Sequence, residues 1–304
     1  MRVTVLAGGT GSAKLLRGLA AVLPDFSVVA NVGDNVWMHG LYICPDIDIA
    51  MYTLAGVANR RLGWGVKGDT FAFMDQLGRL GGETWFSLGD RDLATHVMRT
   101  ESLRRGESLT KVTEKLCGRL GVRQRVLPAT DSPVQTWVET PKGAMLLQDF
   151  WVRLKGGPAV SGIEYRGAPA STATEQVREA IMTAERIVVC PANPVTSIGP
   201  ILAVPGILKF LRETPARIVA LSPMKGSAPF SGPAGKLLKA SGGTSDSVGV
   251  ATRYETFLDA LVIDKGDRAL AGVVSRKGIE CRVSDIGMAR PSDERRLARE
   301  LLRV

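Results

Sequence analysis

The sequence places a glycine-rich segment shortly before several carboxylates, a combination that suits phosphate and metal chemistry. Gly8-Gly9-Thr10-Gly11-Ser12-Ala13-Lys14 follows an apolar run. Glycines at that point let backbone N–H groups approach a phosphate at the start of a helix. The segment is neither a Walker A loop nor a complete G-x-G-x-x-G, because Lys14 stands at the third glycine position. Two interpretations stay open, a phosphate-binding loop and a tight strand-to-helix turn.

The nearest carboxylates are Asp34, Asp46 and Asp48. Asp46 and Asp48 are two positions apart, so in an extended segment both side chains point to the same side. Mg²⁺ commonly uses one or two carboxylates together with phosphate oxygens. The alternative for Asp46 is a capping role, in which it begins a helix after Pro45, and the two interpretations are equally favoured. For Asp48 we favour a functional role.

Arg91 lies between Asp90 and Asp92, just before His96. Exposed ion pairs of this kind are common and contribute little to stability. Arginine is also the preferred planar donor for phosphate and carboxylate groups. The segment is therefore either an ion-paired surface turn or part of an anion-binding site.

A polar loop from Asn193 to Pro200 follows another apolar run. Ligands of open α/β sheets bind at the carboxyl ends of strands, where such a loop lies. Ser197 and the N–H of Gly199 are placed to hold phosphate oxygens, and Asn193 is placed to contact a base or ribose. The alternative is a helix start with Ser197 as cap and Pro200 in the first turn.

The elements that position these residues alternate between short apolar runs and helical patterns, which predicts a doubly wound, Rossmann-like α/β fold with a mostly parallel sheet. We expect a single α/β domain over residues 1–304, with a mostly helical insertion at about 60–125. A helix is expected at Ile201–Leu211. The expected strands are Val3–Ala7, Phe26–Ala30, Arg186–Cys190, Arg217–Leu221 and, as the last of the sheet, Leu261–Asp264.

The composition limits the partners. Lys and Arg total 39 against 30 Asp and Glu, a net charge of +9, but the basic pairs are isolated and aromatic residues make up only 6%. We therefore expect neither a nucleic-acid nor a membrane partner.

The four cysteines lie at least 73 residues apart and form no C-x-x-C pair, which favours a reducing cytoplasm over a disulfide framework. With two histidines, a multi-histidine metal site is excluded.

Taken together, these blocks resemble the CofD family, the 2-phospho-L-lactate transferases of coenzyme F420 biosynthesis. The resemblance extends over nearly the whole chain. It rests on the ordered combination of the glycine segment Gly8–Lys14, Asn31-Val32-Gly33-Asp34, Cys44-Pro45-Asp46-Ile47-Asp48, Gly63-Trp64-Gly65, Leu88–Arg99, Asn193-Pro194 and Ser222-Pro223. Many members of the family carry a second Asp where Asn35 stands here.

The resemblance implies transfer of a phospholactyl or related phosphoenolpyruvyl group from a guanosine diphosphate-linked donor to the deazaflavin Fo, with release of GMP and a requirement for Mg²⁺. It assigns Asp48 and Arg91 to the Fo site, Asp34 and Asp48 to the metal, and Asp48 and Lys14 to catalysis. We also expect a homodimer. The residues expected around the guanylate donor are Gly9, Thr10, Gly11, Ser12, Lys14, Asn193, Ser197 and Gly199.

The alternative from another class is a nucleotide-binding dehydrogenase or a regulatory Rossmann-type protein. In that interpretation Gly9 and Gly11 approach the dinucleotide, and Asp34 binds the ribose. A response to a nicotinamide cofactor, without release of GMP, would distinguish it from the transferase.

Overall fold

The central sheet is built from the apolar runs of the sequence. In the computed structural model, which describes residues 1–229 and 232–304, seven strands form this sheet and pair in parallel throughout. β1 and β13 are buried along their whole length, as expected for strands covered on both faces. The strands in order across the sheet are β5 (Arg125–Pro128), β2 (Ser27–Ala30), β1 (Val3–Ala7), β9 (Arg186–Val189), β10 (Arg217–Leu221), β13 (Ala260–Asp264) and β14 (Glu280–Ser284).

The strand order reverses direction at β1. From β1 the chain moves outward through β2 to β5 on one side, and later from β9 through β10 to β13 and β14 on the other. The fold is therefore doubly wound, as the sequence predicts. Crevices that bind ligands form beside such a reversal, at the carboxyl ends of the strands on either side.

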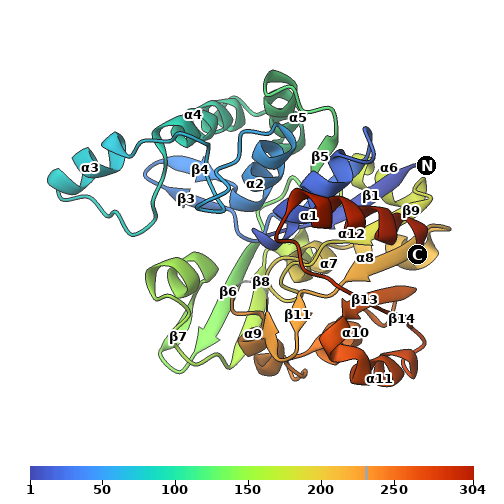
Figure 1. Cartoon of the computed structure of the whole chain (residues 1–304). Helices are drawn as coiled ribbons and strands as arrows, with labels where there is room; N and C mark the ends of the chain where they lie inside the picture. Colours follow the sequence, from blue (N-terminus) through green and yellow to red (C-terminus); the bar gives the residue numbers. More distant parts are fainter. Residues whose placement is uncertain (230–231) are drawn as a thin grey trace.

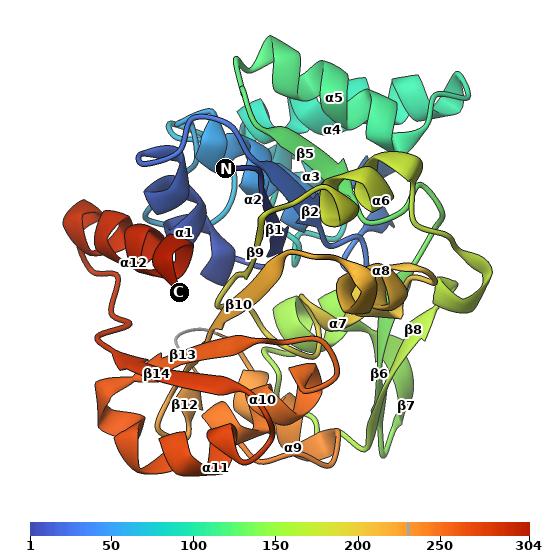
Figure 2. The same ribbon diagram turned by 90° about the vertical axis from the view of Figure 1, so that its right-hand side faces the viewer.

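Helices pack on both faces of the sheet (Figure 2). On one face α1 (Gly11–Ala20) packs against both α2 (Pro45–Leu54) and α12 (Pro291–Arg303). On the other face α6 (Glu175–Met182) packs against α8 (Ile207–Glu213). No helix in the described ranges is both long enough and apolar enough to cross a membrane. The remaining helices after β9 are α7 (Gly199–Ala203), α9 (Ala234–Ala240), α10 (Ser247–Tyr254) and α11 (Ala271–Ser275).

Between β2 and β5 the chain forms a mostly helical region, in which α3 projects farthest from the sheet (Figure 1). Apart from the main core, this region has a small apolar cluster of its own around Val36, Ile43, Met74 and Leu88. Its elements besides α2 are the antiparallel ribbon of β3 (Val36–Met38) and β4 (Leu41–Ile43), and the helices α3 (Ala72–Arg79), α4 (Asp90–Arg104) and α5 (Leu109–Arg119).

A three-stranded antiparallel sheet lies between β5 and α6 in the chain. It contains β6 (Gln135–Thr140), β7 (Gly143–Leu146) and β8 (Gly162–Arg166), with β6 in the middle. A short π-helix at Asp149–Arg153 follows β7. After β10, a two-stranded ribbon pairs β11 (Met224–Lys225) with β12 (Ala228–Pro229).

Two expectations about elements were wrong. The helix expected at Ile201–Leu211 is two short helices, α7 and α8. Val204, which precedes Pro205, is extended and ends the first helix, and Gly206, with a φ of +96°, precedes the second. The sheet does not end at Leu261–Asp264, since β14 pairs in parallel along its outer side. β14 alternates half-buried and exposed residues and lacks the continuous apolar run that reveals a central strand.

Candidate active site

A cavity of about 420 Å³ opens at the carboxyl ends of β1 and β9, beside the reversal of the strand order. The segment after β1 contributes Gly9 and Gly11 to its wall, and the segment after β9 contributes Asn193 and Ser197. Segments that are distant in the chain therefore share one wall. This is the place where ligands bind in open α/β sheets.

The glycine segment needs its glycines because it packs directly against the loop after β9. A Cβ on Gly8 would lie 2.8 Å from the carbonyl oxygen of Ser197, and one on Gly11 would lie 2.5 Å from that of Pro191. Gly9 has a φ of +64°, and a Cβ there would lie 2.8 Å from Ser197 Oγ. Side chains at these positions would push the two loops apart, so the glycines bring both loops to the cavity.

Ser12 and Lys14 lie differently from the glycines. The Ser12 hydroxyl donates to the Gly8 carbonyl at 2.7 Å and accepts from the Gly8 N–H at 3.1 Å, so it braces the segment from inside. Lys14 lies on the exposed side of α1 and is not among the residues that line the cavity. Thr10, in contrast, lines the cavity.

The loop after β9 is held in shape by Asn193. Its Oδ1 accepts from the N–H of Val195 at 2.9 Å, while its buried Nδ2 has no hydrogen-bond partner among the described residues. That Nδ2 is an unsatisfied donor on a residue that lines the cavity, so it is a candidate partner for a ligand. Gly199 serves packing instead: the ring of Tyr165 occupies the space of a Cβ there, and the Tyr165 hydroxyl donates to the Val195 carbonyl at 2.5 Å.

Asp34 and Asp46 share one amide group. Asn31 Nδ2 donates to Asp34 Oδ1 at 3.0 Å and to Asp46 Oδ2 at 2.8 Å. Burial raises the pKa of Asp46 to about 6 against hydrogen bonds from Asn31 and Gly9, and the negative charge of Asp48 adds to the increase. Burial and the charge of Asp46 also raise the pKa of Asp34. In the part of the chain that is described, neither carboxylate forms a salt bridge, so their negative charge is uncompensated.

Asp46 and Asp48 do not point to the same side, because the segment is helical. Both belong to the first turn of α2, and residues two apart on a helix face different directions. The expectation of a shared direction, which assumed an extended segment, is therefore wrong. Asp46 faces Asn31 and the glycine segment, while Asp48 faces α4. The side chain of neither residue caps the helix.

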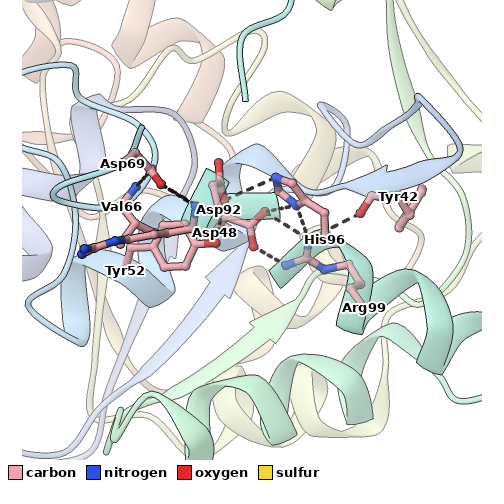
Figure 3. A network of polar contacts seen from close by, with 9 residues as sticks. Tyr42, Asp48, Tyr52, Val66, Asp69, Asp92, His96 and Arg99 are labelled. Atoms are coloured by element: carbon pink, nitrogen blue, oxygen red, sulfur yellow. Dashed lines mark hydrogen bonds and ion pairs between the residues drawn. The ribbon is translucent and has the colours of Figure 1, made fainter. Parts of the chain in front are cut away.

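Asp48 belongs to a buried polar network between α2 and α4 (Figure 3). Arg99 Nη1 donates to Asp48 Oδ2 at 3.1 Å, and Arg99 Nη2 donates to Asp48 Oδ1. His96 lies between two acids, with Nδ1 3.6 Å from Asp48 Oδ2 and Nε2 3.3 Å from Asp92 Oδ1. The Tyr52 hydroxyl donates to Asp92 Oδ1 at 2.6 Å. Asp48, Tyr52, Asp92 and His96 line the cavity.

Sequence reasoning missed this network. Asp92, His96 and Arg99 follow one another at i, i+4 and i+7, which places them on one side of α4. The sequence shows this spacing, but it does not show that Asp48, their acidic partner, packs against them from another helix. A polar helical stripe is usually solvated, and here it is buried.

The described residues offer a hard divalent cation two groups of carboxylates. Ligand atoms of Asp48, Asp92 and His96 lie within 4.8 Å of one another, but Arg99 already places a permanent positive charge on Asp48. Asp34 and Asp46 carry no such cation and lie beside the glycine segment, so oxygen ligands for Mg²⁺ fit there. Asp34 and Asp48, the two expected metal ligands, therefore have different partners. Asp34 shares the Asn31 amide with Asp46, and Asp48 is paired with Arg99.

Arg91 lies on the exposed surface at the start of α4 and does not line the cavity. Its Nη1 donates to the Lys67 carbonyl at 3.0 Å, on the loop that supplies Trp64 and Gly65 to the cavity. Asp90 accepts instead from backbone N–H groups at the start of α3. Arg91 makes no salt bridge to Asp90 or Asp92, both of which are described, so the interpretation as a surface ion pair is wrong.

Aromatic side chains form another part of the cavity wall. Trp64 and Trp85 come from the mostly helical region, and Trp151 comes from the π-helix after β7. Flat, apolar surfaces of this kind suit the faces of planar heterocycles. The cavity therefore combines phosphate-type backbone donors, buried carboxylates and stacking surfaces.

Comparison with known proteins gives consistent matches over almost the whole chain. The family described as "2-phospho-L-lactate transferase CofD" matches residues 3–286. The 2-phospho-L-lactate transferase of Methanosarcina acetivorans is 41% identical over 97% of this chain and 96% of that protein. The phosphoenolpyruvate transferase of Streptomyces griseus is also 41% identical, over 100% and 98%. A crystal structure of a UPF0052 family protein from Bacillus halodurans has the same fold, with a TM-score of 0.65, 16% identity and coverage of 99% and 98%.

Proposed function

This chain belongs to the CofD family of 2-phospho-L-lactate transferases, and from this premise we propose that it acts in coenzyme F420 biosynthesis. The proposed reaction moves a phospholactyl or phosphoenolpyruvyl group from a guanosine diphosphate-linked donor to the deazaflavin Fo and releases GMP. The observation that carries the proposal is the cavity, in which a glycine segment, buried carboxylates and aromatic rings meet in one space.

The donor is assigned to the two loops at the carboxyl ends of β1 and β9. Backbone N–H groups of the glycine segment and the positive end of the α1 dipole favour the diphosphate. Asn193 Nδ2, which has no protein partner among the described residues, is assigned to the guanosine. Ser197 Oγ lies against Gly9 and is assigned to a phosphate oxygen. Ser12 and Gly199 support the two loops from behind.

The acceptor is assigned to the side of the cavity that carries Asp48 and the aromatic rings. Trp64 and Trp85 offer faces for the deazaflavin, and Asp48 accepts a hydrogen bond from its terminal hydroxyl. Arg91 is assigned to the rim on that side, because its guanidinium fixes the loop that carries Trp64.

In the proposed step, the hydroxyl oxygen of Fo attacks the phosphorus that bears the three-carbon acid. The bond from that phosphorus to the bridging oxygen breaks, the electron pair leaves with GMP, and the hydroxyl proton is lost to water. Such transfer depends mainly on positioning and charge neutralisation, so no strong base is required. Mg²⁺, when bound, would neutralise charge on the diphosphate, and Asp34 and Asp46 would hold it. The sequence also predicted Asp48 as a metal ligand and Lys14 as a catalytic residue. This proposal uses neither role, because Asp48 is paired with Arg99 and Lys14 is exposed outside the cavity lining.

The test is incubation of the protein with Fo, Mg²⁺ and each guanosine diphosphate-linked donor, followed by the masses of both products. The expected result is an F420-0-type product and GMP in equal amounts. GMP release that does not depend on Fo would contradict the proposal. The same assay identifies the acid, because relatives named for lactate and for phosphoenolpyruvate are equally identical to this chain.

We further propose that the protein works in the cytoplasm as a homodimer. Its four cysteines are all free, which is consistent with a reducing compartment. Light scattering coupled to size-exclusion chromatography tests the dimer, because a mass of 32.5 kDa would show a monomer.

A further inference from the structure

We infer that Arg99 is a positioning residue, whose guanidinium fixes the Asp48 carboxylate in the orientation in which it receives the acceptor. The inference rests on the proposed function, because it concerns the residue assigned to the acceptor hydroxyl. Arg99 itself does not line the cavity, whereas Asp48 does. Arg99 therefore influences a ligand only through the groups that it holds.

The contact between the two side chains fixes a direction as well as a charge. Arg99 is fully buried, and two of its nitrogens donate to the two oxygens of Asp48 (Figure 3). This two-point contact sets the plane of the carboxylate. A single-point contact would leave the carboxylate free to rotate about its χ2 angle. The lone pairs of Asp48 that remain are those available to the cavity.

The contact also compensates charge inside the protein. Arg99 and Asp48 are both buried, and each is the ion-pair partner of the other. Removing Arg99 would leave the Asp48 carboxylate buried without that partner and free to turn toward other donors.

In this cluster the cation that pairs with Asp48 is the Arg99 guanidinium. Asp48, Asp92 and His96 have metal-ligand spacing, with ligand atoms within 4.8 Å of one another. The guanidinium cannot lose its charge, and it occupies both oxygens of Asp48, so a second cation there would meet repulsion. Arg99 therefore supplies the positive charge of the Asp48–Asp92–His96 cluster. A fixed side-chain cation of this kind holds Asp48 in one orientation toward a substrate.

Other contacts keep α4 in the position that Arg99 needs. Thr100, the next residue, accepts from the N–H of Tyr42 at 2.8 Å and joins α4 to β4. His96 Nδ1 lies 3.2 Å from Arg99 Nη1 on the preceding turn. Arg99 Nε has no partner among the described residues, so Asp48 and His96 provide the main anchor of the guanidinium.

The test compares Arg99→Met and Arg99→Lys with Asp48→Asn, measuring steady-state kinetics for Fo and donor separately. Arg99→Met is expected to lower kcat/KM for Fo at least about tenfold, and Asp48→Asn is expected to lower it by a similar factor. Donor binding should stay within about twofold in every variant. Arg99→Lys should recover little, because an ammonium cannot hold both oxygens. The matched control is Arg104→Met, since Arg104 is exposed on the same helix and donates to the Gly40 carbonyl.

The double variant Asp48→Asn/Arg99→Met separates positioning from general loss of structure. Each single variant leaves a buried group without its partner, but the double variant removes both charges and is expected to fold and to bind donor. If Arg99 acts through Asp48, the double variant is no worse with Fo than Asp48→Asn alone. Multiplied losses, or unchanged Fo kinetics in Arg99→Met, overturn the inference while the wild type stays active. A wild type that gives no product with any donor overturns the proposed function itself.

Discussion

The carboxylates of Asp46 and Asp48 differ in whether a cation balances their negative charge. Asp48 has a cation of its own in Arg99, whereas Asp46 has only the hydrogen bonds of Asn31 and Gly9. The two acids are neighbours in sequence and nearly equally buried. Their environments suit one for a fixed, ionised role and the other for a group that binds or releases a cation.

The raised pKa of Asp46 predicts a specific pH dependence of stability. Its folded-state pKa of about 6 lies above the unfolded value, so the folded protein binds more protons and loses stability as pH rises from about 4 to about 6. Asp46→Asn removes this loss, which should be about 3 kcal/mol. Urea unfolding of both proteins in excess chelator, from pH 4 to 8, checks the effect. Parallel stability profiles for the two proteins would show that Asp46 titrates normally.

Arg91 allows a prediction about the acceptor alone. Arg91→Ala should change stability by less than about 1 kcal/mol, because the side chain is exposed and its one contact is to the Lys67 carbonyl. We assign the other N–H donors of Arg91, at the rim of the cavity, to Fo. Loss of that proposed charged hydrogen bond should lower use of Fo roughly 10- to 150-fold, and Arg91→Lys should recover little. Separate titrations of Fo and donor check this. Unchanged Fo affinity and turnover would remove Arg91 from the site.

The glycine segment is the element whose backbone matters most. Gly9→Ala is expected to cost about 1–2 kcal/mol of stability, because its φ of +64° is unfavourable for alanine. It should also weaken donor binding at least about tenfold, since the new Cβ displaces Ser197 Oγ. Gly40→Ala is the matched control: Gly40 has a φ of +76° but no atom near the Cβ position. Calorimetry with the donor should show a loss only for Gly9→Ala, and equal donor affinity in both variants would contradict the assignment.

The elements that could be predicted from sequence are those with a local signal. Central strands such as Val3–Ala7 appear as apolar runs, and the glycine segment ends the first of them. The site was harder to predict because its contacts join distant segments. Asp48 and Arg99 meet across 51 positions, and no local pattern indicates that α2 faces α4. The direction of Asp46 and Asp48 depended on a choice between helix and extended chain, which Pro45 at the start of α2 decides.

At the scale of the whole molecule, the proposed metal belongs to the donor side of the cavity, where Asp34 and Asp46 lie beside the glycine segment. Removal of Mg²⁺ by chelator should abolish GMP release, and readdition should restore it. Mn²⁺ binding, followed by electron paramagnetic resonance, should be lost in Asp46→Asn and retained in Asp48→Asn, because Asp48 is already paired with Arg99. Mn²⁺ binding that is lost in Asp48→Asn and retained in Asp46→Asn would assign the metal to Asp48 instead. Full activity after verified loss of the metal would show that the reaction does not need Mg²⁺.

The parallel pairing of β1 with β9 has a consequence for the order of synthesis. Val3 pairs with Arg186, so the strand made first has to wait for a neighbour made far later. At typical elongation rates the interval is roughly 10 to 40 s. During that time the glycine segment exists without the loop that it packs against, and one side of an apolar strand is unpaired. β1 therefore cannot complete its pairing before β9 has been made, and the cavity wall that the loops after β1 and β9 share forms only then.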